Sequence, residues 1–136
     1  MQKYTFVGHT ADMRLQIEAS TLAELFQVAL LALAELMYPK APCEKPTSTQ
    51  VITISSVDTT SLLIDFLAEI LALSHIKATL FTQVEFQSLT PTQLTAKIYG
   101  VPVDHFEKDV KAVTYHEAEV KTTKSGTFET SIIFDI

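Results

Sequence analysis

The sequence predicts an α+β fold: a single domain made of a mainly antiparallel β-sheet with two helices packed on it. Three observations lead to this prediction. A strictly alternating segment near the start indicates a half-buried strand, two helical patterns follow, and the chain beyond Thr79 is rich in β-branched and aromatic residues. Because 136 residues with 47% hydrophobic character can bury one good core, we expect one domain over residues 1–136.

The first two elements are predicted by periodicity and capping. Residues 13–19 alternate between apolar and polar types, which predicts a strand with one buried face. A helix is expected over residues 21–38, where apolar residues recur at helical spacing. Thr21 and Glu24 form a capping box at its start, and Pro39 ends it.

The middle of the chain predicts a loop, a short strand and a second helix. Residues 39–49 contain three prolines and are expected to form an exposed connection to a strand over residues 51–54. A helix follows Asp58, a suitable N-cap, and runs to about Leu73. Apolar residues cover more than half of its circumference, so it must pack on several sides.

The second half of the chain predicts four strands and a tight turn. Ser125 and Gly126 mark the last hairpin turn, and alternation in the final strand directs the side chain of Asp135 to its less apolar face. The strands are expected over residues 80–88, 92–100, 111–122 and 128–135.

Charge and cysteine content exclude several classes of protein. The formal net charge is −6, and Arg14 and nine lysines supply no broad basic surface, so direct tight nucleic-acid binding is not expected. A lone Cys43 and a start without an apolar signal region predict a cytoplasmic protein. The apolar run at residues 28–34 is too short to cross a membrane, so no membrane association is expected.

Common catalytic motifs are missing from the sequence. The three glycines are isolated, so there is no phosphate-binding loop, and the four histidines form no zinc-ligand pair. There is no nucleophile elbow, and Cys43 in a proline-rich segment is a poor nucleophile. Asp65 and Glu69 are spaced i, i+4 on the second helix, but a narrow polar strip on a buried helix is the favoured interpretation.

Two acidic residues at opposite ends of the chain are the candidate metal ligands. Asp12 lies in an early segment, and Asp135 is followed only by Ile136 and its carboxylate. If folding brings these oxygens together, they form a solvent-open site for a hard cation such as calcium, magnesium or manganese. The alternative is that Asp12 begins a strand after a turn and Asp135 is solvated at a polar edge.

Lys111 and His116 flank a second group of polar residues. In a strand, Lys111 and Tyr115 share one face while Thr114 and His116 share the other. A structural histidine with satisfied hydrogen bonds is the default interpretation of His116.

Four segments of the chain form a recognisable series: His9-Thr10-Ala11-Asp12 before the alternating strand, Leu62-Leu63-Ile64-Asp65-Phe66-Leu67 in the second helix, Lys111-Ala112-Val113-Thr114-Tyr115-His116, and Ile133-Phe134-Asp135-Ile136. In this order they resemble the archease family. The resemblance covers nearly the whole chain, so residues 1–136 are expected to form an archease-like domain.

The resemblance implies a function that the residues alone do not. Archeases are non-catalytic cofactors of the GTP-dependent tRNA-splicing RNA ligase, which joins 3′-phosphate or cyclic-phosphate ends to 5′-hydroxyl ends. They promote ligase guanylylation and multiple turnover in tRNA splicing and RNA repair. The family's metal ligands match Asp12, Asp135 and Ile136, the last through a main-chain or terminal oxygen, with calcium as the first choice of ion. His9, Lys111 and His116 are expected to support these ligands or to contact the ligase.

Two other functions stay open at this point. A metal-dependent phosphoesterase would use Asp12 and Asp135 around a divalent ion. A general folding chaperone would need an exposed apolar tract, and the sequence contains no segment that demands one. Within the activator function, binding could also open the ligase conformationally, with the metal serving only to order the end of this chain.

Overall fold

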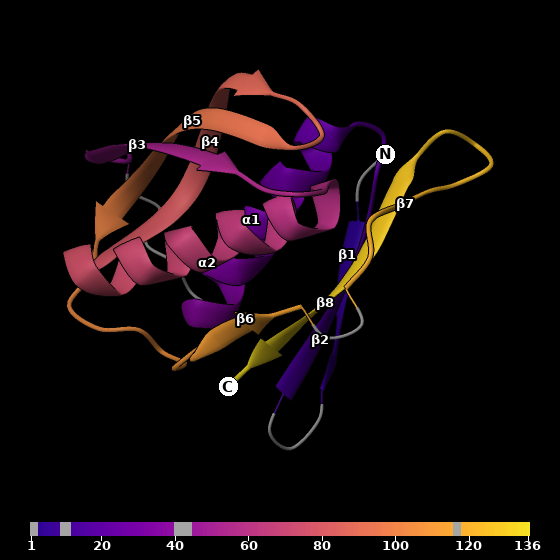
Figure 1. Cartoon of the computed structure of the whole chain (residues 1–136). Coiled ribbons are helices and arrows are strands. Elements are labelled where there is room, and N and C mark those ends of the chain that lie inside the picture. Colours follow the sequence, from indigo (N-terminus) through magenta and orange to yellow (C-terminus); the bar gives the residue numbers. More distant parts are fainter. Residues whose placement is uncertain (1–2, 9–11, 40–44, 116–117) are drawn as a thin grey trace.

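The chain folds into two antiparallel β-sheets with both helices between them (Figure 1). The computed structural model describes residues 3–8, 12–39, 45–115 and 118–136. The elements are β1 (Lys3–Gly8), β2 (Asp12–Ala19), α1 (Leu22–Met37), β3 (Ser48–Ser55), α2 (Thr59–Lys77), β4 (Thr79–Leu89), β5 (Gln93–Pro102), β6 (Ala112–Thr114), β7 (Lys121–Thr122) and β8 (Phe128–Asp135).

The predicted α+β class is confirmed, and the strands divide into two sheets. One sheet has the order β1-β2-β8-β6, with β7 also paired to β8, and the other has the order β3-β5-β4. α1 contacts β2 and β4, while α2 contacts β6, β3 and β4, so each helix touches both sheets. The helices therefore join two sheets that share no hydrogen-bonded strand pair in the described part of the chain.

The helix boundaries follow from the caps that the sequence predicted. The Thr21 hydroxyl accepts a hydrogen bond from the Glu24 amide at 3.1 Å, which confirms the first cap. Asp58 accepts from the Ser61 amide at 2.7 Å at the start of α2. α2 continues to Lys77 and ends at Ala78, which adopts a left-handed conformation with φ 48°.

α2 is buried on several sides, as its apolar circumference predicted. Its 19 residues have a mean hydropathy of 1.4, which by length and composition would suffice to cross a membrane. It is the one such helix in the described residues, but core helices of globular proteins share these properties. Eight of its residues are buried between the two sheets: Leu62, Leu63, Ile64, Phe66, Leu67, Ile70, Leu71 and Ser74.

Aromatic packing holds the layers together. Phe26 of α1 and Phe66 of α2 are both fully buried, with ring centroids 5.3 Å apart. Phe86 of β4 completes the group at 6.1 Å from Phe26 and 6.0 Å from Phe66. Burying side chains of this size contributes about 1.5–3 kcal/mol each, which makes the contact between helices and sheets a major source of stability.

Three sequence predictions differ from the observed elements. β1 was not predicted, and β3 begins at Ser48, earlier than the strand expected over residues 51–54. The single strand expected over residues 111–122 is wrong, since among its described residues only those of β6 and β7 are in strands. The chain leaves the sheet at Tyr115, whose hydroxyl donates to Asp65 of α2 and so draws the segment away from β8.

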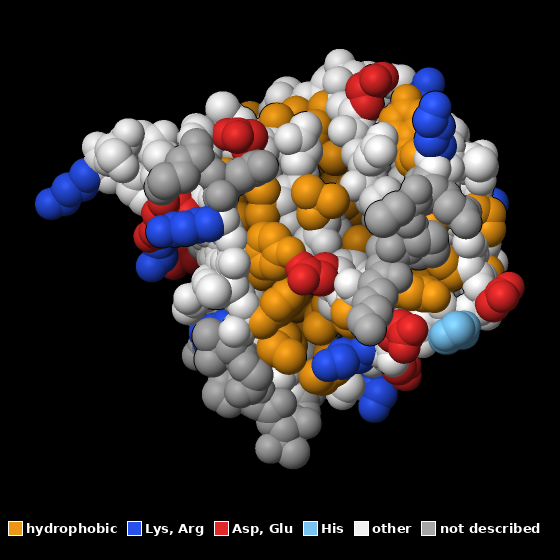
Figure 2. Space-filling view, turned by 180° about the vertical axis from the view of Figure 1, so that it is seen from behind, with side chains coloured by type: hydrophobic (Ala, Val, Ile, Leu, Met, Phe, Trp, Pro, Cys, Tyr) orange, Lys and Arg blue, Asp and Glu red, His pale blue; other side chains and the backbone are white. Residues whose placement is uncertain are grey.

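One side of the molecule leaves α1 partly uncovered. Figure 2 shows hydrophobic side chains gathered over the back of the molecule, with acidic and basic side chains around them. Leu31 of α1 is 45% exposed, and it lines a shallow hollow of about 340 Å³ together with Lys3, Tyr4 and Val28. This apolar area reflects the open side of the helix layer.

Candidate functional site

Asp12 and Asp135 lie directly opposite each other at one end of the five-stranded sheet. Asp12 is the first residue of β2 and Asp135 the last residue of β8, and the antiparallel register pairs them. Residues that pair directly across two strands project their side chains from the same face. Asp12 is half-buried and Asp135 is exposed. Folding thus brings together the two carboxylates that the sequence singled out.

The apolar pattern of the two strands fixes this register. β2 and β8 pair over eight residues without interruption, from Asp12 opposite Asp135 to Ala19 opposite Phe128. Leu15 opposes Ile132, and both are fully buried. A slip of one residue would turn these side chains to the opposite face, so burial of the inner face holds the two aspartates in register.

Asp12 carries a buried oxygen to which no described residue donates a hydrogen bond. Its Oδ1 atom has no partner among the described residues. Leaving a buried acceptor unsatisfied costs about 1–3 kcal/mol, and more when the group is charged. The carboxylate of Asp135 directly opposite adds like-charge repulsion rather than relief. A cation bound between the two groups would remove both penalties, so the site fits a metal ion.

Two further predicted site residues lie beside this pair. Lys111 precedes β6, and its amide donates a 2.7 Å hydrogen bond to the main-chain oxygen of Asp135. Its side chain is exposed. Ile136 follows β8, and its side chain packs half-buried against the core, which anchors the main chain next to Asp135. These contacts gather Asp12, Asp135, Ile136 and the Lys111 backbone at one sheet end.

The donor set is small and composed of oxygens. Within the described residues, no three side chains of the His, Cys, Asp and Glu types gather into a metal-binding cluster. The two aspartates and nearby main-chain oxygens would leave most positions around an ion to water or to a partner. Such a site suits a hard cation with flexible coordination better than zinc. His9, Cys43 and His116 lie outside the described residues.

Asp65, unlike Oδ1 of Asp12, has hydrogen-bond donors among the described residues. The Ser56 hydroxyl donates to its Oδ2 atom at 2.5 Å, and the Tyr115 hydroxyl donates to its Oδ1 atom. The bond to Asp65, partial burial, and the negative charges of Asp65 and Asp58 raise the pKa of Tyr115 above its ordinary value. The sequence pattern paired Asp65 with Glu69 and did not predict its contact with Tyr115, which lies 50 residues away along the chain.

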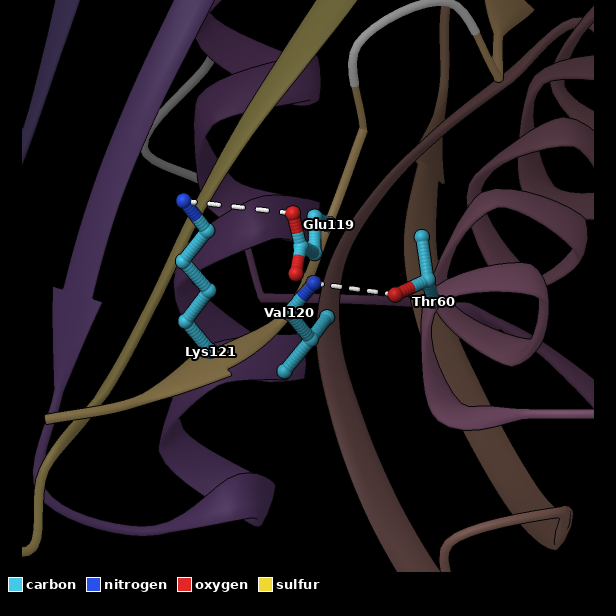
Figure 3. A network of polar contacts seen from close by, with 4 residues as sticks. All are labelled: Thr60, Glu119, Val120 and Lys121. Carbon is cyan, nitrogen blue, oxygen red and sulfur yellow. Dashed lines mark hydrogen bonds and ion pairs between the residues drawn. The ribbon is translucent and has the colours of Figure 1, made fainter.

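A second bond ties the chain after Tyr115 to α2. The Val120 amide donates to the Thr60 hydroxyl at 2.9 Å, and Figure 3 shows the amide directed at the first turn of the helix. Glu119 and Lys121 approach each other at 3.9 Å on the outside, but both side chains are well exposed and the ion pair contributes little. Asp65 and Thr60 of α2 thus bond to the chain after β6 at two points, Tyr115 and Val120.

A polar hollow lies along the opposite half of the same sheet. It encloses about 500 Å³, and its lining includes Gln16, Glu18, Lys121 and Glu129. Neither Asp12 nor Asp135 lines it. The mixed charges of the hollow do not favour a particular ligand, so the sheet end remains the candidate site.

Comparison with known proteins identifies the family. Residues 4–136 match the family model described as Archease protein family (MTH1598/TM1083). The chain belongs to the archease family. This confirms the resemblance carried by the four sequence segments. The match begins within β1 and extends to Ile136, so it includes both strands of the candidate site.

Curated archeases and solved structures agree with this assignment. The archease of Methanosarcina acetivorans is 29% identical over 143 residues, covering 99% of this chain and 97% of the relative. That of Pyrobaculum islandicum is 33% identical over 127 residues, covering 87% and 85%. The solution structure of protein 1598 from Methanobacterium thermoautotrophicum matches with a TM-score of 0.78 and 26% identity over 98% of both chains.

A second solved structure supports the fold alone. The crystal structure of an archease from Thermotoga maritima, described as a possible chaperone, matches with a TM-score of 0.69. The match covers 96% of this chain and 94% of that one, at 19% sequence identity. At this identity, the backbone arrangement is what the two proteins share.

Proposed function

We propose that this archease is a metal-binding, non-catalytic activator of the GTP-dependent tRNA-splicing RNA ligase. It would promote guanylylation of the ligase and repeated turnover in the joining of 3′-phosphate and 5′-hydroxyl RNA ends. Family membership supports this role. The main structural support is the register of β2 with β8, which sets Asp12 opposite Asp135. Oδ1 of Asp12 is buried there without a hydrogen-bond partner in the described residues.

The proposed ligands are Asp12, Asp135 and a main-chain oxygen of Ile136. When bound, a divalent ion would neutralise the two carboxylates and polarise groups brought to it by a partner. Calcium is the preferred ion because it accepts variable oxygen ligands and an irregular shell, with magnesium and manganese as alternatives. The half-buried position of Asp12 favours retention of the ion, while the exposed Asp135 keeps it accessible.

Lys111 is proposed to contact the ligase. Its backbone is fixed by the bond to Asp135, while its charged side chain is free to reach a carboxylate or phosphate on a partner. His9 and His116 are proposed to support the metal ligands or to meet the ligase at the same surface. The net charge of −6 favours a protein partner over tight RNA binding. We propose that the protein acts in the cytoplasm.

The experiment that tests this role is multiple-turnover ligation with the RNA ligase of the same organism, GTP and manganese. Wild-type protein, Asp12→Asn and Asp104→Asn would be compared with ligase alone. Asp104 is an exposed acid in the connection between β5 and β6, outside the two strands that carry the site, so Asp104→Asn makes the same change of side chain and charge elsewhere. We expect the wild type and Asp104→Asn to raise turnover and guanylylated ligase, and Asp12→Asn to do neither.

Three other results would separate the alternatives. Full activation by a folded Asp12→Asn variant would exclude a metal requirement at this site and favour conformational opening of the ligase. No activation by the wild type would refute the activator role for this ligase. Hydrolysis of phosphoesters by the isolated wild type, lost in Asp12→Asn, would favour the phosphoesterase, for which the paired carboxylates are the supporting feature.

A further inference from the structure

β3 is an edge strand of the three-stranded sheet, and no described strand pairs with its outer side. Proteins usually protect exposed edges with charges, bulges or very short strands. The opposite edge, β4, carries Glu85 and two register irregularities, and β1 at an edge of the other sheet carries Lys3. β6 and β7 are only three and two residues long. β3 has eight residues, no charge and no proline, and it pairs with β5 without a bulge.

The hydrogen-bond alternation identifies the groups that point outward from this edge. Ser56 donates to the Thr92 carbonyl at 2.8 Å, one step beyond the pair of Ser55 and Gln93. Because antiparallel pairs alternate between bonded and non-bonded types, the even-numbered residues of β3 bond to β5. The 3.4 Å approach of the Thr53 and Thr95 hydroxyls agrees, since side chains lie closer in non-bonded pairs.

The main-chain groups of four residues therefore face away from β5. The side chains of these residues, Thr49, Val51, Thr53 and Ser55, are also exposed, and that of Val51 is 52% exposed. The carbonyl of Val51 accepts a long 3.5 Å bond from the Gln50 side chain, which an incoming strand would replace with a better one. Among the described strands, none pairs with this edge.

We propose that β3 pairs with β3 of a second copy of this chain, antiparallel and about a twofold axis. The register that uses all four outward residues places Ile52 opposite its copy, Val51 opposite Thr53, and Thr49 opposite Ser55. The two three-stranded sheets then join into one continuous sheet. This inference does not depend on the proposed role toward the ligase, because the β3 edge belongs to the other sheet.

The sequence of the edge favours a second copy as its occupant. In the proposed register only Ile52 faces its own copy, but Val51 of one chain lies diagonally next to Val51 of the other, so a charge at the centre of the edge would come close to the same charge on the second copy. No charged residue occurs from Pro46 to Val57, although the chain as a whole is acidic. β-branched residues opposite one another are favourable cross-strand pairs. The edge is thus complementary to itself.

The test is the oligomeric state in solution, measured by sedimentation equilibrium on wild type, Val51→Lys and Val57→Lys. A single strand pair is a small interface, so concentrations should reach about 0.5 mM. Val57 is 88% exposed and lies just beyond β3, so Val57→Lys matches the substitution without altering the edge. We expect concentration-dependent dimers for wild type and Val57→Lys, and a dimer constant at least about tenfold weaker for Val51→Lys.

Several outcomes would overturn the proposal. A wild type that stays monomeric over this range refutes it, and so does a dimer that survives both Val51→Lys and Thr53→Lys. Circular dichroism establishes that each variant is folded. Hydrogen exchange of the wild type gives an independent readout: the amides of Val51 and Thr53 should become more protected as protein concentration rises. Protection that does not change with concentration would contradict pairing through this edge.

Discussion

Asp12 and Asp65 are half-buried aspartates in two regions of the molecule, and their surroundings differ. Asp65 on α2 accepts hydrogen bonds from the hydroxyls of Ser56 and Tyr115. Asp12 at the end of β2 faces another aspartate across the strand pair, and its buried Oδ1 has no partner in the described residues. A folded chain normally satisfies buried carboxylate oxygens, as it does at Asp65.

The difference separates a structural acid from a binding acid. The carboxylate of Asp65 links α2 by hydrogen bonds to the segment before it and to the segment after β6, so Asp65 stabilises the fold. Asp12 accepts no such bond among the described residues, and its position opposite Asp135 brings together two like charges, which a bound cation would offset. Substitutions can change either of these two sites and leave the other intact.

The largest effect is expected on metal affinity. Asp135→Asn should lower the affinity for Ca²⁺, measured by isothermal titration calorimetry, by at least about 100-fold, because losing a residue that merely supports a ligand already costs 10–100-fold. Asp65→Asn should bind as the wild type does, since Asp65 lies on another element with its own partners. Equal affinity in wild type and Asp135→Asn would place the ion elsewhere.

The next effect is expected on stability. Asp65→Ala should lower the free energy of unfolding by about 1–3 kcal/mol, because the half-buried Ser56 loses its acceptor and Tyr115 loses its anchor. Urea denaturation measures this loss. Glu69→Ala, one turn further along the exposed face of α2, serves as the control and should change stability by less than about 0.5 kcal/mol. Similar losses of unfolding free energy in both variants would mean that the hydrogen bonds of Asp65 contribute no specific stability.

A smaller effect of opposite sign is expected at Asp12. In a chelating buffer, Asp12→Asn should raise the free energy of unfolding by about 0.2–1 kcal/mol, since it removes a like charge directly opposite Asp135. Saturating Ca²⁺ should reverse the order by stabilising the wild type alone. A clear loss of stability in chelator would show instead that the carboxylate already has a favourable partner.

The smallest effect is expected in the titration of Tyr115. Its pKa is raised above the ordinary 10.0 because it donates to Asp65, so the folded state favours the protonated phenol. The stability gained from this bond is present below the unfolded pKa and is lost as pH rises through the folded pKa. The side chain is 56% exposed, which limits the effect. An NMR titration of the ring should show the pKa falling in Asp65→Asn, and an unchanged pKa would contradict the pairing.

Local signals in the sequence predicted most of the elements. The capping pair Thr21 and Glu24, the N-cap Asp58 and the alternation of β2 are short-range features, and the structure contains them. The features that the sequence did not predict depend on contacts between residues far apart along the chain. The break after β6 follows from bonds to Asp65 and Thr60, which no local pattern reveals, and the division into two sheets depends on strand pairing across the whole chain.

The candidate site, like the fold, could be predicted only in part from the sequence. Sequence chemistry and family resemblance selected Asp12 and Asp135, and it is the register of β2 with β8 that makes them direct neighbours. The isolation of the Asp12 oxygen could not be read from the sequence, because it depends on which groups surround it after folding. Binding of a metal by Asp12, Asp135 and Ile136 stays a prediction.

The most direct test of that prediction is an NMR titration of ¹⁵N-labelled protein with Ca²⁺, repeated on Asp12→Asn. We expect the amide signals of Asp12, Ala112 and Asp135 to shift in the wild type, because these residues are adjacent across the sheet end. The same signals should stay unmoved in the variant. A titration that moves none of them, or that moves instead residues of the polar hollow such as Glu18 and Glu129, would contradict a metal site at this position.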